Sequence, residues 1–323
     1  MKKRIISLLI AAFIVLQSGI ISFAGDTETP IVPTNPNVQI NGLSIVLSGE
    51  IGLTFYVYVA KPYRGGTMEF TFMDKEPITM NIIDCPVDNS THRFMATYYL
   101  SAIELSEPVT LSVYAADDTE HDKPLAQASY SAEDYVGFLL KDEKATEKEK
   151  NVAKTLINYG HYAQLALSEA NGWKIGEDYA ETTEFFAPTV DTSVFDNYKI
   201  DWQNKTELSY QMSMSLSLDY KTGINLYFPL EEKPTVTVNG KAVDVIESER
   251  LEDNYEVRIE GINALNLEGE YEITVNGDTF TLSALSYCCL AASYETTEHN
   301  IDAMKALYEF YQATVIYNTP AEK

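Results

Sequence analysis

Apolar and polar residues alternate along most of the first half of the chain. A period of two places one face of each strand on a core and the other toward solvent. Clusters of Gly, Pro, Asn and Asp separate the runs, as they do in antiparallel sheets. Six strands are predicted, which favours a β-sandwich, at residues 43–47, 53–59, 68–72, 78–82, 94–98 and 109–115.

The period changes near Ser131, which has the spacing of a capping box with Asp134 and predicts a helix at 132–140. A charged connector, 142–150, precedes a stripe of apolar residues from Val152 to Leu167 at spacings of three and four, typical of a second helix. We expect the two helices to form a hairpin laid against the first sandwich.

Alternation lapses over 171–205, where isolated aromatic residues predict an ordered but irregular connection; they are Trp173, Phe185, Phe186, Phe195 and Trp202. It then returns, and Asn239-Gly240 and Asn276-Gly277 are strong hairpin signals. The predicted strands are 210–218, 224–228, 236–238, 243–245, 255–259, 271–275 and 280–282. Helices are predicted at 282–293 and 300–317.

These patterns predict an α+β, mainly β protein with two antiparallel β-sandwich-like units, each followed by a pair of helices. The predicted divisions are a signal peptide 1–24, a Pro-rich linker 25–37, a β-sandwich with helical hairpin 38–170, an irregular connection 171–205, a second β-sandwich with helices 206–318 and a tail 319–323.

The N-terminus has the three parts of a secretory signal. Lys2, Lys3 and Arg4 precede an apolar run, and Ser22-Phe23-Ala24 offers a small-x-small cleavage site. The run is too short and too interrupted for a membrane anchor. We expect a secreted, extracellular protein, with attachment to the cell surface left open and no transmembrane segment after cleavage.

The two halves also share residue patterns. Gly52-Leu53 and Tyr56 match Gly223-Ile224 and Tyr227 at an offset of 171, and weaker matches follow at offsets of 162 and 151. This predicts an internal duplication. Two unrelated sandwiches with the same apolar pattern are the alternative.

Several of these segments resemble a known module. Glu50-Ile-Gly-Leu-Thr-Phe-Tyr-Val-Tyr58 and Leu156-Ile-Asn-Tyr-Gly-His-Tyr-Ala-Gln164, with Ser215 to Phe228 in the second half, are similar to a module of secreted and cell-surface proteins from anaerobic Gram-positive bacteria. The resemblance covers roughly residues 40–170 and 205–318. It implies structural motifs and no established activity.

Net charge and cysteine content limit the range of possible functions. Without the three basic residues of the predicted signal, 20 Lys and Arg oppose 48 Asp and Glu, a balance of −28. Such a surface repels phosphate backbones, so nucleic acid is excluded as a partner. Cys85, Cys288 and Cys289 are an odd set, which indicates buried free thiols more than a disulfide framework.

No residue pattern indicates catalysis or a cofactor. None of the four histidines has the spacing of a zinc site, and no Gly-x-Ser-x-Gly occurs. A Ser/His/Asp triad would have to assemble from scattered residues. The short predicted connections disfavour the cleft that a glycosidase carboxylate pair needs.

Two weaker candidates are a metal loop and a tyrosine surface. Carboxylates that could hold Ca²⁺ follow the sixth strand, although a solvated loop is favoured; they are Asp117, Asp118, Glu120 and Asp122. On the polar strand face lie three tyrosines that could stack on sugars, unless they only fill half-buried positions; they are Tyr56, Tyr58 and Tyr99.

The sequence favours an exported, non-catalytic interaction or adhesion module with an unknown protein or glycan partner at the cell envelope. A carbohydrate-binding or accessory protein in polysaccharide use, and an enzyme of unrecognised type, are the alternatives.

Overall fold

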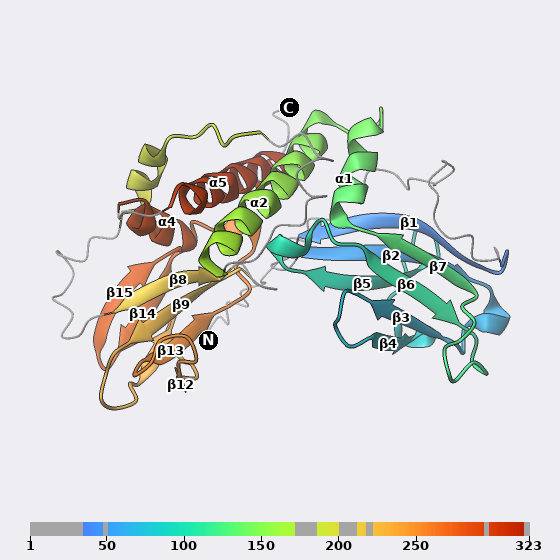
Figure 1. Cartoon of the computed structure of the whole chain (residues 1–323), viewed down its shortest axis with the longest axis horizontal. Helices are drawn as coiled ribbons and strands as arrows, with labels where there is room; N and C mark the ends of the chain where they lie inside the picture. The colour runs from blue at the N-terminus through green and yellow to red at the C-terminus, as the bar shows by residue number, and fades with distance from the viewer. Residues whose placement is uncertain are drawn as a thin grey trace, which may run out of the picture.

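The computed structural model describes residues 35–47, 51–171, 186–199, 212–217, 222–293 and 297–319, although side chains 168–171 are not described. The predicted signal peptide, residues 25–34 of the linker, Trp173, Phe185, Trp202 and most of the tail lie outside them. The fold is α+β, with four antiparallel sheets and a layer of helices (Figure 1).

The first half contains the six predicted strands and one more. They are β1 (Val38–Leu47), β2 (Ile51–Val59), β3 (Thr67–Thr71), β4 (Ile78–Asn81), β5 (Phe94–Leu100), β6 (Val109–Tyr114) and β7 (Ala126–Tyr130), with the 3₁₀ helices η1 (Lys61–Tyr63), η2 (Ile82–Asp84) and η3 (Ala102–Glu104). The strand orders are β1-β2-β5 and β4-β3-β6-β7. β7 was not predicted because its small, half-buried residues show no strong alternation.

The second half repeats this order. Its strands are β8 (Ser213–Ser217), β9 (Gly223–Phe228), β10 (Val236–Val238), β11 (Lys241–Ala242), β12 (Ile246–Glu247), β13 (Tyr255–Ile259), β14 (Tyr271–Val275) and β15 (Asp278–Leu282), with η6 (Ala264–Asn266) before β14. The orders are β12-β13-β9-β8 and β11-β10-β14-β15. Apart from β12, each strand therefore has a counterpart in the first half, with the same neighbours.

Both Asn-Gly hairpins are confirmed, since all four residues have positive φ. The predicted strand 243–245 is wrong. A two-residue turn pairs Val238 directly with Lys241, so the returning strand begins at once, and the next strand, β12, starts only at Ile246.

The four predicted helices are confirmed as α1 (Ala132–Lys141), α2 (Glu147–Asn171), α4 (Ala284–Ser293) and α5 (Glu298–Asn318). The capping box at Ser131 is present. α2 begins inside the expected charged connector. The reason is a second capping box, in which the Glu149 carboxylate accepts the backbone N–H of Thr146 at 2.7 Å and the Thr146 hydroxyl accepts that of Glu149 at 3.3 Å.

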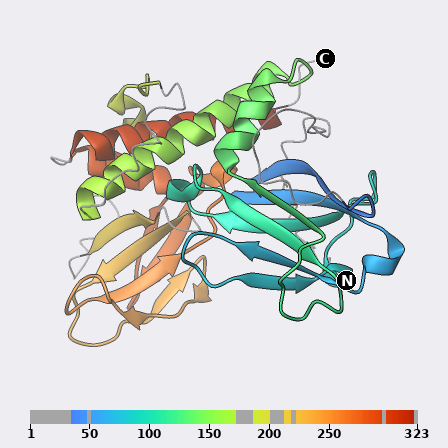
Figure 2. The ribbon, with the colours of Figure 1, turned by 45° about the vertical axis from the view of Figure 1, so that its right-hand side comes forward.

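α2 packs mainly along α5, instead of closing a hairpin on the first sheets as predicted (Figures 1 and 2). The rings of Tyr159 and Phe310 stack at 6.0 Å between centroids and 9° between planes. On another side of α2, Gly160 lies so close to η3 that a Cβ would fall 2.8 Å from the carbonyl oxygen of Ala102. α2 thus contacts both halves of the chain.

The described part of the irregular connection, 186–199, is held by this helix pair. The Glu309 carboxylate of α5 accepts the backbone N–H of Thr189 at 2.6 Å and of Val190 at 3.3 Å. Asn158 of α2 accepts that of Phe186 at 3.3 Å. Within η5 (Thr192–Tyr198), buried Phe195 meets the ring of Tyr308 edge-on at 5.7 Å. The described part is therefore held in place, and it includes a 3₁₀ helix that the sequence did not predict.

Two glycines allow a test of this packing. A Cβ on Gly223 would lie 2.7 Å from the carbonyl oxygen of Ile259, which cannot move aside. We expect Gly223→Ala to lower the free energy of unfolding by about 1–3 kcal/mol, the usual cost of overpacking. Gly137, inside α1, has nothing within 4 Å of its added Cβ. Gly137→Ala, the control, should raise stability by about 0.5–1 kcal/mol. Urea unfolding of both variants checks this, and equal effects would contradict it.

Candidate functional site

The three candidate tyrosines share the polar face of the sheet β1-β2-β5, but they differ in exposure. Tyr58 and Tyr99 are 43% and 45% exposed, whereas Tyr56 is 9% exposed and accepts a hydrogen bond from Ser44 at 3.2 Å. Tyr56 is therefore a packing residue. Tyr99 pairs with Gly52, six residues before Tyr58 on the next strand, so the exposed rings stand about 20 Å apart along the sheet.

The carboxylates of the acidic loop do not converge. Asp118 accepts the backbone N–H groups of Asp122 at 3.2 Å and Lys123 at 2.9 Å, which fixes the loop between β6 and β7. Asp117, Glu120 and Asp122 are exposed. Over the described part of the chain, no group of three or more His, Cys, Asp or Glu is placed to hold a metal ion. Ca²⁺ binding here stays an untested prediction.

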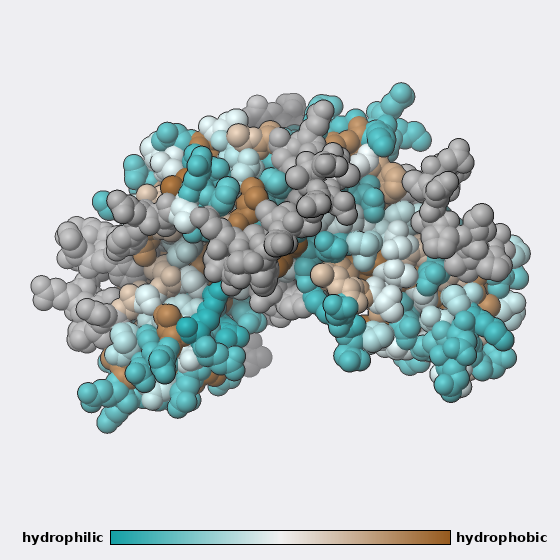
Figure 3. Space-filling model, viewed as in Figure 1, coloured by the Kyte–Doolittle hydropathy of each residue, from teal (hydrophilic) through white to brown (hydrophobic). Residues whose placement is uncertain are grey.

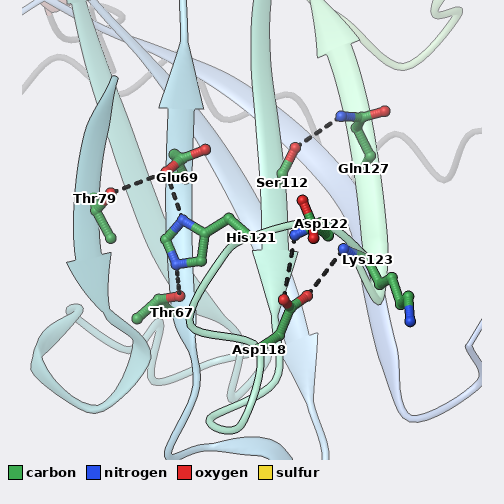
Figure 4. A network of polar contacts seen from close by, with 9 residues as sticks. All are labelled: Thr67, Glu69, Thr79, Ser112, Asp118, His121, Asp122, Lys123 and Gln127. Carbon is green, nitrogen blue, oxygen red and sulfur yellow. Dashed lines mark hydrogen bonds and ion pairs between the residues drawn. The ribbon is translucent and has the colours of Figure 1, made fainter. Parts of the chain in front are cut away.

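The same loop brings His121 over the sheet β4-β3-β6-β7 (Figure 4). Its Nδ1 lies 2.7 Å from the carboxylate of Glu69, and its Nε2 lies 3.1 Å from the hydroxyl of Thr67. The ring stacks on Tyr114 at 4.4 Å and 8°, and Thr79 donates to the same carboxylate oxygen at 3.1 Å. Residues far apart in sequence therefore form a hydroxyl–imidazole–carboxylate array, which we call the His121 array.

The His121 array has the order of groups found in activated nucleophiles. In the tautomer with the proton on Nδ1, the ring donates to Glu69, and its Nε2 accepts from the Thr67 hydroxyl. Acyl transfer also needs donors for an oxyanion and room for a substrate. Instead, one face of the imidazole is covered by Tyr114. The array connects β3, β4 and β6 to the loop, as a structural clamp does.

Glu256 is the most buried charged residue described, and sequence reasoning missed it. Its carboxylate accepts from the Arg258 guanidinium at 2.6 Å and from the Ser248 hydroxyl at 3.0 Å. Both oxygens are thus engaged inside the protein. The only indication of this burial in the sequence is a glutamate within a predicted strand, where apolar and polar residues alternate.

A cavity of about 330 Å³ lies between η5 and α4, at the lower end of the range for small-molecule pockets. Its lining includes Asp191, Asp196, Lys199 and Cys289. The three charged residues are exposed. Burial, and secondarily Asp196, raise the pKa of the Cys289 thiol despite Lys199. A raised pKa disfavours the thiolate, which is the nucleophilic form of cysteine.

All three cysteines are free thiols, Cys85 and Cys288 buried and Cys289 partly so. No described helix is both long enough and apolar enough to cross a bilayer.

His161 on α2 is half-buried, and its ring meets Tyr162 edge-on at 5.1 Å. Burial, with the nearby His299 of α5, lowers the pKa of His161 to about 4. The imidazole is therefore neutral at pH 7, as expected for a histidine packed between helices.

This lowered pKa predicts a loss of stability in acid. The unfolded chain binds a proton on His161 with a pKa near 6.5 and the folded chain only near 4, so this contribution is full above about pH 6.5 and lost as the pH falls toward 4. After discounting for partial exposure, we expect about 1–2 kcal/mol. Unfolding free energies at about pH 7.5 and 4.5 should differ less in His161→Gln than in the wild type. The exposed His92, replaced by Asn, is the control; equal pH dependence in all three proteins would refute the assignment.

Comparisons with known proteins leave the chain without assigned relatives: no protein-family model matches it, and no curated protein does. The resemblance to the secreted module therefore stays a hypothesis.

Proposed function

We propose that this chain is an exported, non-catalytic interaction protein, formed by two duplicated β-sandwich units whose helices pack together. The observation that carries the proposal is where the polar and the apolar groups lie. The side chains best suited to chemistry are engaged in internal contacts, whereas eleven large apolar side chains of the described residues are exposed, six of them in the first half. Exposed apolar surface on a folded protein marks an interaction site.

The duplication is supported by contacts that occur once in each half. Ser44 bonds Tyr56 at 3.2 Å, and Ser215 bonds Tyr227 at 3.0 Å, both at an offset of 171. A backbone bond of 3.0 Å from Glu133 to Leu105 has a counterpart of 3.1 Å from Leu285 to Leu267. The reciprocal caps of α1 and α4 also correspond. A shared apolar pattern alone does not explain matched polar contacts.

The sandwich arrangement is supported by ring contacts between sheets. Phe55 of β2 lies 5.7 Å from Phe70 of β3, and Phe70 lies 5.5 Å from Tyr98 of β5. Export rests on the N-terminal sequence alone.

The mature chain, from Gly25, should bind a component of the envelope of the cells that produce it and should not accelerate ester hydrolysis. Binding is measured by cross-linking to envelope fractions and on a glycan array. Hydrolysis of 4-nitrophenyl acetate should be the same for the wild type and for Thr67→Ala, because the His121 array is a clamp. Turnover that Thr67→Ala abolishes would contradict the non-catalytic assignment.

Carbohydrate binding is the second candidate, favoured by the exposed rings of Tyr58 and Tyr99 on one sheet face. Aromatic pairs contribute about 0.5–1.5 kcal/mol beyond their buried area, and we expect a ring stacked on a sugar to contribute on the same order. Tyr58→Ala and Tyr99→Ala should then each weaken retardation in polysaccharide-containing gels, with Tyr56→Phe as the control. If polysaccharide does not retard the wild-type protein, carbohydrate binding is refuted.

A further inference from the structure

Exposed apolar side chains concentrate on one edge of the first half. Of the eleven large apolar side chains exposed among the described residues, four lie between residues 73 and 87. They are Met73, Ile78, Ile83 and Val87, exposed by 63%, 50%, 67% and 43%. We call this region, residues 73–88, the β4 edge. It includes β4 and η2.

β4 is the end strand of its sheet and is paired on one side only, with β3. An antiparallel end strand directs alternate backbone N–H and C=O groups away from its partner. Proteins usually protect such edges with charged residues or bulges. Ile78-Thr79-Met80-Asn81 carries no charge, and its pairing with β3 is regular. The strand is suited to accept another.

The core-side residues of β4 are incompletely covered. Ile78 pairs with Phe70 and Met80 with Met68, so both lie on the core side of the sheet. Phe70 and Met68 of β3 are buried, whereas Ile78 is 50% exposed and Met80 is only half-buried. Apolar surface of β4 is therefore available to a neighbouring strand.

The second half offers a comparison, because the counterpart of β4 there is β11, the end strand next to β10. β11 consists of Lys241 and Ala242 and so carries a charge, whereas β4 carries none. The strand β12 lies in the other sheet, next to β13, where the first half has the bridge between Val87 and Phe94 beside β5.

Charge selects the kind of partner. The β4 edge carries four carboxylates and one lysine, and Lys75 is already paired with Glu104 at 2.5 Å; the carboxylates are Asp74, Glu76, Asp84 and Asp88. A second copy would bring the same charges and the balance of −28 that the chain carries without its predicted signal. Like charges facing each other oppose association, whereas basic residues favour it.

We propose that the β4 edge binds an extended segment of a partner protein in which apolar residues alternate with Lys or Arg. The segment adds as a strand to β4, with main-chain hydrogen bonds for affinity and apolar side chains packed on Ile78 and Met80. This inference rests on the proposed interaction function and names the partner's chemistry.

The probe is a short, capped peptide of alternating valine and lysine, whose binding to the mature chain is followed by fluorescence anisotropy. We expect saturable binding, slower hydrogen exchange at residues 78–81, and no binding of the matching valine–glutamate peptide. Replacing the central valine by proline should weaken binding, because a ladder hydrogen bond and the extended pairing are disturbed.

Ile78→Lys and Ile83→Lys should each weaken the binding at least about tenfold, which corresponds to about 1.4 kcal/mol. Leu251→Lys, at a site 39% exposed in the second half, is the matched control and should bind like the wild type. Circular dichroism and urea unfolding show whether each variant is folded.

Equal binding by Ile78→Lys, or by the acidic peptide, would overturn the proposed site. If the chain still captures an envelope partner in that case, the proposed interaction function is retained and only the assignment of the β4 edge as the binding site is refuted. Capture of nothing by any assay would refute the interaction function itself. A dimer in sedimentation that Ile78→Lys dissolves would make a second copy the occupant and would also overturn the proposal.

Discussion

The packing of α2 against α5 is the constraint on which the arrangement of the chain depends. Each helix follows the sheets of its own half, and their apolar faces bury each other, with Tyr159 stacked on Phe310. These two residues are related by the offset of 151 that relates the helices themselves. Under the proposed duplication these two positions are equivalent, and contact between equivalent positions is the arrangement of a two-fold interface. The helix pair also fixes the connection 186–190 through Asn158 and Glu309.

Polar side chains contribute to architecture more than their types suggest. Buried polar groups need partners, and an unpaired one costs about 1–3 kcal/mol. Tyr56 and Ser44 supply each other's partner on the outer face of one sheet, and Glu256 is neutralised by Arg258. His121 links a long loop to three strands in the same way. Residues that look functional in the sequence are here used to hold strands and loops in register. In Figure 3, hydrophilic residues cover the loops at the two lower ends of the molecule.

Apolar periodicity predicted most strands and all four helices, because strand and helix periods are local properties. It missed β7, whose residues are small and half-buried, and misplaced the strand after Gly240, since turn geometry decided where pairing began. The candidate sites were less predictable. Thr67 and Glu69 lie 54 and 52 residues from His121 in the sequence. No short sequence motif predicts that residues so far apart come into contact. The burial of Tyr56 depends on a ring lying across the neighbouring strand near Gly42, which a binary pattern does not encode.

If the halves are copies, each serves as a reference for the other. A residue that the fold requires should have an equivalent, and Tyr56 has Tyr227, with the same serine partner. By strand pairing, Tyr58 corresponds to Pro229 and Tyr99 to Glu260, so neither exposed tyrosine is required by the sandwich. The end strands differ in composition. β11, the counterpart of β4, is Lys241-Ala242, whereas β4 has no charged residue and carries the exposed Ile78. A charged residue on an end strand opposes pairing with another strand. Under the proposed duplication, this protection is therefore absent from the first half at the equivalent edge, which is why the proposed binding surface is assigned to β4.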